Sequence, residues 1–99
     1  MNMNTTPLEA ETRVLIDRSL ENLGWKLNGK DKNVFFEQPK TESERKKLCG
    51  KRPDYVLYSK ESEKPLIVIE AKKKGSRIDE ALEQGIGYAR AIDAPLVFA

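Results

Sequence analysis

The stretch PDYVLYSKESEKPLIVIEAK at residues 53–72 decides the expected fold. Residues 54–58 are rich in aromatic and branched side chains, which is typical of a strand, and residues 60–64 have the composition of a polar turn. Residues 66–69 are a continuous apolar run of strand length, the pattern of a central strand buried on both faces. The stretch therefore predicts an antiparallel hairpin whose second strand runs directly into charged residues.

Two segments outside the hairpin have the periodicity of amphipathic helices. One covers about residues 7–23, with Gly24 placed to end it, and the other covers residues 78–91. The apolar positions that carry this periodicity are Leu8, Leu15, Ile16, Leu20, Leu23, Ile78, Leu82, Ile86 and Ala89.

The remaining segments are short and extended. Residues 33–37 and 95–99 predict strands, residues 26–27 give a weaker extended signal, and residues 40–52 are a loop or a short helix. The expected fold is therefore α/β with the order α-β-β-β-α-β. We expect a single domain over 1–99, with its core at about 7–98, and a fragment of a longer chain truncated at its C-terminus, because the last strand is cut off.

Composition excludes several chemistries. The chain has 99 residues, no histidine and a single cysteine, Cys49, so one small domain without a Cys/His zinc site, a disulfide or a histidine-based catalytic triad is expected. Acid–base or metal chemistry must then use carboxylates and lysines. No apolar run reaches the roughly 18 to 20 residues of a membrane span, so we expect no membrane contact and a reducing, cytoplasmic setting.

Charge is distributed unevenly along the chain. The formal net charge is only +2, but residues 40–77 hold twelve basic and six acidic side chains. Such a segment suits a polyanion such as DNA, although a lysine-rich solvated surface has the same pattern.

Two carboxylates are expected to meet at one end of the hairpin. Asp54 opens the first strand and Glu70 lies at the end of the second, so antiparallel pairing places them at the same end of the sheet. With the backbone carbonyl of Ala71 and several waters, they form the oxygen ligand set that Mg²⁺ prefers. Lys72 would orient an attacking water and stabilise charge on phosphorus, which predicts phosphodiester hydrolysis. The alternative is a Glu70–Lys72 salt bridge at a strand end.

These residues resemble a known signature. Pro53-Asp54 followed by Glu70-Ala71-Lys72 resembles the PD-(D/E)XK nucleases, and Gln84 with Tyr88 resembles the Gln-x-x-x-Tyr element of type I restriction enzyme motor subunits. The resemblance to the amino-terminal domain of those subunits extends over residues 9–98. The further segments that carry it are 9–13, Gly24-Trp25, 50–58 and 69–72.

The resemblance implies a restriction-endonuclease-like core, in which a mixed β-sheet is flanked by helices. It implies that Asp54 and Glu70 bind Mg²⁺ or Mn²⁺, that Lys72 is the catalytic lysine, and that Gln84 and Tyr88 support the site or contact DNA. Glu9, with Glu11 as the second choice, would approach the metal, although Glu9 is equally explained as the capping-box partner of Thr6. The residues expected to contact phosphates are Arg45, Lys46, Lys47, Lys51, Arg52, Lys73 and Lys74.

The function that follows is a magnesium-dependent endonuclease domain of a type I restriction-modification system, acting on double-stranded DNA. Its partners would be the methylation and specificity subunits and a helicase-like motor region, because this chain has no phosphate-loop motif for ATP. An exposed sheet edge would also permit a homodimer. The alternatives are a non-catalytic DNA-binding or subunit-docking module and a stand-alone repair nuclease of the same superfamily.

Overall fold

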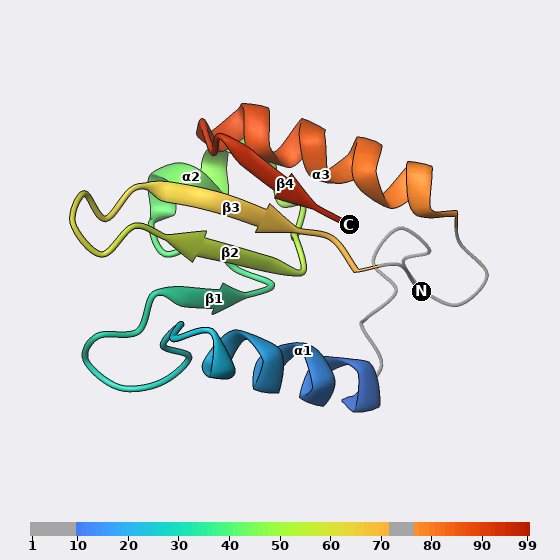
Figure 1. Cartoon of the computed structure of the whole chain (residues 1–99). Helices are drawn as coiled ribbons and strands as arrows, with labels where there is room; N and C mark the ends of the chain where they lie inside the picture. Colours follow the sequence, from blue (N-terminus) through green and yellow to red (C-terminus); the bar gives the residue numbers. More distant parts are fainter. Residues whose placement is uncertain (1–9, 72–76) are drawn as a thin grey trace.

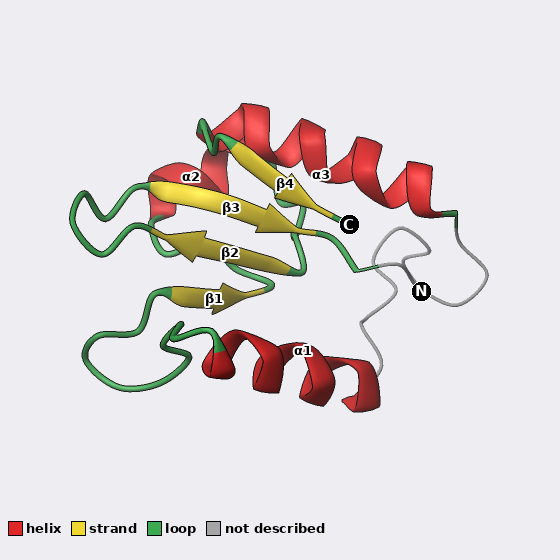
Figure 2. Cartoon of the chain, in the orientation of Figure 1, coloured by secondary structure: helices red, strands yellow, loops and turns green. Residues whose placement is uncertain are grey.

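A computed structural model describes residues 10–71 and 77–99 of the chain (Figures 1 and 2). No helix in these residues is long and apolar enough to cross a membrane. The elements, in chain order, are α1 (Ala10–Asn22), β1 (Val34–Phe36), α2 (Glu42–Lys47), β2 (Tyr55–Tyr58), β3 (Pro65–Ile69), α3 (Ile78–Ile92) and β4 (Leu96–Phe98).

The four strands form one mixed sheet in the order β1-β2-β3-β4. Strand β2 pairs antiparallel with both β1 and β3. Strand β4 pairs with β3 in parallel after the crossover through α3. The predicted hairpin and the expected order of elements are therefore confirmed. The structure adds α2 within the segment left as loop or short helix, while the weak extended signal at residues 26–27 is not a strand.

Each face of the sheet carries its own hydrophobic cluster, because successive strand residues point to opposite faces. On one face, Val56, Tyr58 and Val68 pack with Tyr88 and Ile92 of α3. On the other face, side chains of β1, β2 and β3 pack with Leu20 and Ile16 of α1. The two helices therefore pack on opposite faces of the sheet. In Figure 1, α1 is seen next to β1 and α3 next to β4.

The predicted core faces of the helices are partly wrong. Ile78 and Leu82 are 60% and 42% exposed, and Leu15 and Leu23 of the first helical segment are 64% and 76% exposed. Helix α3 instead buries a set of mostly small residues: Ala81, Gly85, Tyr88, Ala89 and Ile92. The apolar periodicity located the helices but not the side that packs. Leu8 lies outside the described residues.

The most buried strand is also a different one from the strand predicted. All four residues of β2 are buried, whereas in β3 only Val68 is buried and the flanking residues are half-buried. Both strands are interior in the sheet order, but the side chains of β2 are buried members of the clusters on both faces, whereas Ile67 and Ile69 of β3 are only partly buried beside the cluster on the α1 side.

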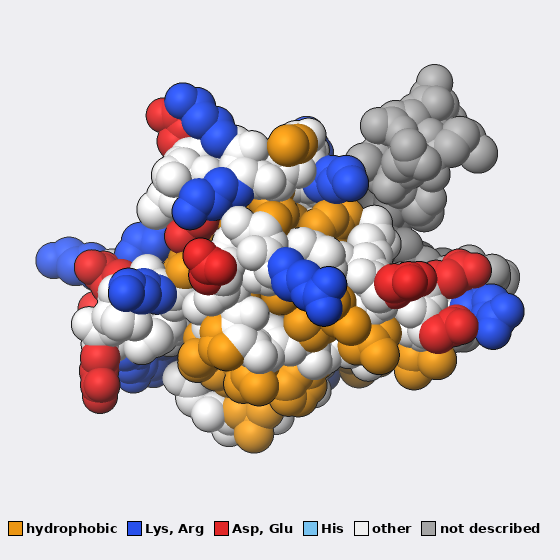
Figure 3. All heavy atoms as spheres, turned by 90° about the horizontal axis from the view of Figure 1, so that it is seen from above, with side chains coloured by type: hydrophobic (Ala, Val, Ile, Leu, Met, Phe, Trp, Pro, Cys, Tyr) orange, Lys and Arg blue, Asp and Glu red, His pale blue; other side chains and the backbone are white. Residues whose placement is uncertain are grey.

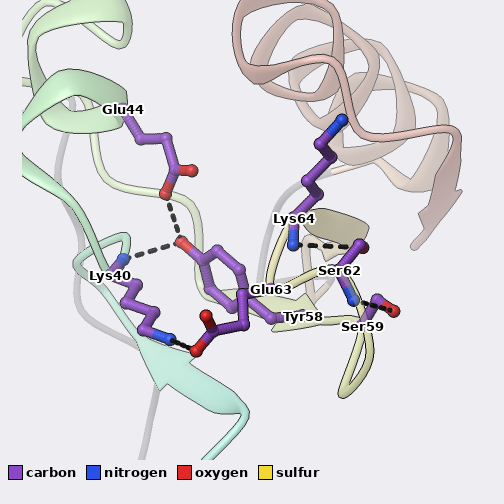
Figure 4. A network of polar contacts seen from close by, with 7 residues as sticks. All are labelled: Lys40, Glu44, Tyr58, Ser59, Ser62, Glu63 and Lys64. Atoms are coloured by element: carbon purple, nitrogen blue, oxygen red, sulfur yellow. Dashed lines mark hydrogen bonds and ion pairs between the residues drawn. The ribbon is translucent and has the colours of Figure 1, made fainter.

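Helix α2 is attached to the sheet through polar contacts of Tyr58 (Figure 4). The Tyr58 hydroxyl donates to Glu44 Oε1 at 2.6 Å and accepts from the Lys40 amide at 2.6 Å. Lys40 Nζ in turn pairs with Glu63 Oε1 at 3.0 Å, on the loop between β2 and β3. Helix α2 has no buried residue of its own, but its C-cap residue Leu48 is buried in the core cluster beside Tyr58. The polar contacts and the packing of Leu48 together fix the position of the helix.

Alkaline pH is expected to unfold the domain as its three tyrosines ionise. Burial is the largest cause that raises the pKa values of Tyr55, Tyr58 and Tyr88 above the ordinary 10.0. Above pH 10.0 the unfolded chain therefore loses these protons while the folded chain keeps them, so stability falls as pH rises. Tyrosinate absorbance and circular dichroism should change together, and tyrosinate appearing near the ordinary pKa in a folded protein would contradict this.

Candidate functional site

The register of the hairpin places Asp54 opposite Glu70. Tyr55 pairs with Ile69 and Val56 with Val68, so the next positions outward are Asp54 and Glu70. Both side chains belong to the face that α3 covers, because they alternate with Tyr55 and Ile69, which pack toward α1. The structure thus brings the two predicted carboxylates to the same end of the sheet, and both residues are buried, at 5% and 2% exposure.

Each carboxylate accepts a hydrogen bond from a backbone amide on the opposite strand. The Asp54 amide donates to Glu70 Oε1 at 2.7 Å, and the Ala71 amide donates to Asp54 Oδ2 at 2.9 Å. These bonds hold both carboxylates across the pair of strands. Carboxylate oxygens held in this way are the hard oxygen donors that a divalent cation such as Mg²⁺ prefers.

The backbone at the site is fixed from the outer strands as well. The Glu37 amide, after β1, donates to the Asp54 carbonyl at 3.0 Å. The Glu70 amide donates to the Phe98 carbonyl of β4 at 2.9 Å. Asp54 and Glu70 therefore sit on a continuous hydrogen-bonded ladder and not on a loose strand end.

Helix α3 brings Gln84 and Tyr88 to this face of the sheet. Gln84 Nε2 donates to the Tyr88 hydroxyl at 2.7 Å, which agrees with their expected position on one side of the helix. Tyr88 is buried, whereas Gln84 is exposed. Burial raises the pKa of Tyr88, the negative charges of Glu70 and Asp54 raise it further, and the Gln84 bond lowers it. The Tyr88 hydroxyl is therefore neutral and lies within the electrostatic influence of both carboxylates.

The predicted phosphate-contacting residues of the described segments fall into two groups. Lys51 and Arg52 are exposed and immediately precede Pro53, at the carboxylate end of β2. Arg45, Lys46 and Lys47 form the last turn of α2, beside Tyr58 at the opposite end of β2, roughly 13 Å away along the strand. Arg45 also donates to the Pro39 carbonyl at 3.1 Å.

Several predicted residues fall outside the described part of the chain, namely Glu9, Lys72, Lys73 and Lys74. Within residues 10–71 and 77–99, no group of three or more His, Cys, Asp or Glu side chains could hold a metal ion. Glu11, the second choice on the first helix, is exposed. Of the predicted metal ligands, Asp54, Glu70 and Ala71 lie in the described part of the chain, and their binding of a metal ion stays a prediction.

Sequence reasoning missed two parts of the arrangement. The backbone amides of Asp54 and Ala71 that bind the carboxylates carry no sequence signal, because every residue here has an amide. Gly85, which faces Glu70 from α3, was also missed. Its signal was present as the small residues Ala81, Gly85 and Ala89 at intervals of four, which permit a close approach of helix and sheet.

A mixed sheet between helices, with two carboxylates opposed at one end of an antiparallel hairpin, defines a restriction-endonuclease-like α/β domain. The chain belongs to the family described as the type I restriction enzyme R protein N terminus, whose model matches residues 35–99, more than half of the chain.

A curated relative agrees with this family. The chain is 51% identical over 49 residues to a type I restriction enzyme EcoAI endonuclease subunit of Escherichia coli. The match covers 50% of this chain and 6% of that subunit. No solved structure matches the chain.

Proposed function

We propose that this domain is the metal-dependent endonuclease domain of a type I restriction-modification system, which hydrolyses phosphodiester bonds of double-stranded DNA. The observation that carries the proposal is the reciprocal pairing of Asp54 and Glu70 through backbone amides on the opposite strand. Two buried carboxylates held at one end of the sheet are an oxygen donor set of the kind that divalent metal ions prefer. Family membership supports the same activity.

The donor set fits Mg²⁺, with Mn²⁺ as the alternative. Both ions prefer carboxylate, carbonyl and water oxygens, and Asp54, Glu70 and the Ala71 carbonyl would supply the protein ligands. Glu9 is a further proposed ligand. A bound ion of this kind would supply Lewis-acid activation of a water and of the phosphoryl oxygens.

The protein groups have separate proposed roles. The oxygen of a water forms a bond to phosphorus in line with the leaving sugar oxygen, whose bond to phosphorus breaks. The water loses a proton and the leaving oxygen takes one up. Lys72, two residues after Glu70, would orient the water and stabilise the extra negative charge on phosphorus. Tyr88, held by Gln84, would support Glu70 from α3.

DNA binding is proposed to rest on phosphate contacts. Lys51 and Arg52 lie at the carboxylate end of β2 and would contact the strand being cut, whereas Arg45, Lys46 and Lys47 would contact phosphates further along the duplex. Lys73 and Lys74 are proposed for the same role. In the full system the partners would be the methylation and specificity subunits and the helicase-like motor, and the site of action would be the cytoplasm.

A plasmid nicking assay tests the proposal. With Mg²⁺ or Mn²⁺, the wild-type protein should nick supercoiled plasmid, chelation should stop it, and Lys72→Ala should lower the rate by roughly a hundredfold or more. Lys64→Ala is a matched control, because Lys64 is an exposed lysine on the loop before β3. Equal nicking by wild type and Lys72→Ala would contradict the assigned role of Lys72.

A second candidate function is a non-catalytic docking module, and β4 favours it. This strand ends the described sheet, and its Leu96 and Phe98 are 47% and 57% exposed. Figure 3, viewed from above Figure 1, shows hydrophobic side chains gathered along one side of the molecule. A second copy of this chain joining at the β4 edge is one proposed partner. Self-association of the chain in solution, with no plasmid cleavage under any metal, would favour this candidate.

A further inference from the structure

Gly85 is the point where α3 comes closest to Glu70. A Cβ atom added at Gly85 would lie 3.3 Å from Glu70 Cγ and 3.6 Å from Glu70 Cβ. It would also lie 2.8 Å from Val97 Cγ1 of β4, a distance that Cβ atoms essentially never show. Glycine fits this position because a larger side chain would lack room, and not because of backbone conformation, since Gly85 is an ordinary helical residue.

The side chain beneath Gly85 is that of Glu70, which is hydrogen-bonded within the candidate site. Glu70 is buried, and its Oε1 accepts the Asp54 amide at 2.7 Å. The Glu70 backbone is bonded to β4 through its amide, so the strand itself cannot easily give way. Any atom added at Gly85 must therefore displace Val97, tilt the Glu70 side chain, or lift α3 together with Tyr88.

We propose that Gly85 is a positioning residue for Glu70: its missing side chain lets α3 lie against the Glu70 methylenes and hold the carboxylate on the Asp54 amide. The consequence for metal binding rests on the function proposed above, whereas the consequence for the hydrogen bond does not. The helix contains its own control, because a Cβ at Gly87 meets nothing within 4 Å.

Amide hydrogen exchange measured by NMR tests the proposal without any metal. In Gly85→Ala, the Asp54 amide should exchange roughly tenfold to a hundredfold faster, as expected for weakening a hydrogen bond to a charged group. The reference is the Tyr58 amide of the same strand, which donates to the Asn33 carbonyl at 2.8 Å and does not involve Glu70. The ratio of the two rates separates local loss from general destabilisation. Gly87→Ala should leave this ratio unchanged, and an unchanged ratio in Gly85→Ala would overturn the proposal.

The double variant Gly85→Ala with Val97→Ala separates positioning from packing, with Val97→Ala alone as its reference. It removes the 2.8 Å clash but keeps the 3.3 Å contact with Glu70 Cγ. We expect the thermal unfolding midpoint of the double variant to match that of Val97→Ala, while its Asp54 amide still exchanges fast. Recovery of both would mean that Gly85 only makes room for Val97, which would overturn the proposal. This variant also carries the test if Gly85→Ala alone fails to fold.

Calorimetric measurement of Mn²⁺ affinity tests whether the position of Glu70 affects metal binding at the proposed site. The double variant should bind Mn²⁺ roughly tenfold to a hundredfold more weakly than Val97→Ala, the range seen when groups that orient metal ligands are lost. Unchanged Mn²⁺ affinity despite a fast Asp54 amide would overturn the link between positioning and metal binding. If the wild-type protein binds no Mn²⁺, the proposed function fails, while the exchange result still decides the role of Gly85.

Discussion

Glu70→Gln is expected to abolish DNA cleavage while the domain stays folded. Glutamine has the same length as glutamate, and its carbonyl oxygen can still accept the Asp54 amide, which lies 2.7 Å from Glu70 Oε1. Its side chain also keeps the methylenes that lie under Gly85. What it loses is the negative charge, which the proposed metal site needs. Loss of several kcal/mol of transition-state stabilisation corresponds to roughly a thousandfold slower cleavage or more.

The measurement is plasmid nicking with Mg²⁺, combined with thermal unfolding of the same samples. Glu83→Gln is the matched control, because Glu83 is an exposed glutamate on α3. Glu70→Ala should differ from Glu70→Gln in stability, since it leaves the buried Asp54 amide without its acceptor, at a cost of about 1–3 kcal/mol. Cleavage by Glu70→Gln at the wild-type rate would exclude Glu70 from the reaction.

The convergence of Asp54 and Glu70 could be predicted because it depends on local rules. A short polar segment joins two apolar runs, so the chain folds back on itself and the residues at the outer ends of the two strands meet. The hydrogen bonds that hold the carboxylates could not be predicted from side-chain types, because their donors are backbone amides. Sequence therefore predicted which groups meet but not what fixes their orientation.

The packing side of α3 could not be predicted from hydrophobic periodicity. That pattern gives most weight to large apolar side chains and selected Ile78 and Leu82, which are exposed. Around Gly85 the helix lies too close to the sheet for such side chains, since even one methyl group there would clash with Val97. Small residues therefore occupy the contact, and their periodicity is weak in any hydrophobicity scale.

Helix α2 was ambiguous for a different reason. Its residues Glu42–Lys47 are all polar and none is buried, so they have no apolar face to detect. What holds the helix is the Thr41 side chain at its N-terminus, the contact of Glu44 with Tyr58, and the buried Leu48 directly after its last residue. The partner of Glu44 is a residue of β2, fourteen positions later in the chain, and no local pattern indicates such a contact.

Tyr58→Ala is expected to remove a large part of the stability of the domain. Tyr58 is 1% exposed, and its ring packs edge-on against Phe35 with centroids 5.3 Å apart. Truncating a buried aromatic side chain to alanine costs about 3–5 kcal/mol, whereas domains of this size are stable by about 5–15 kcal/mol. The variant also loses the hydroxyl that joins α2 to the sheet. Urea unfolding should show a large drop in the midpoint or no folded baseline.

Tyr58→Phe separates the loss of the hydroxyl from the loss of the ring, and Leu23→Ala is a control. Tyr58→Phe keeps the ring but leaves the Lys40 amide and Glu44 without the hydroxyl, so it should cost about 1–2 kcal/mol. Leu23→Ala removes an apolar side chain that is 76% exposed and should change the urea midpoint very little. If Tyr58→Phe destabilised the domain as much as Tyr58→Ala, the hydroxyl network would dominate and the packing argument would be wrong. A cost confined to Tyr58→Ala would mean instead that α2 is held by contacts other than this hydroxyl.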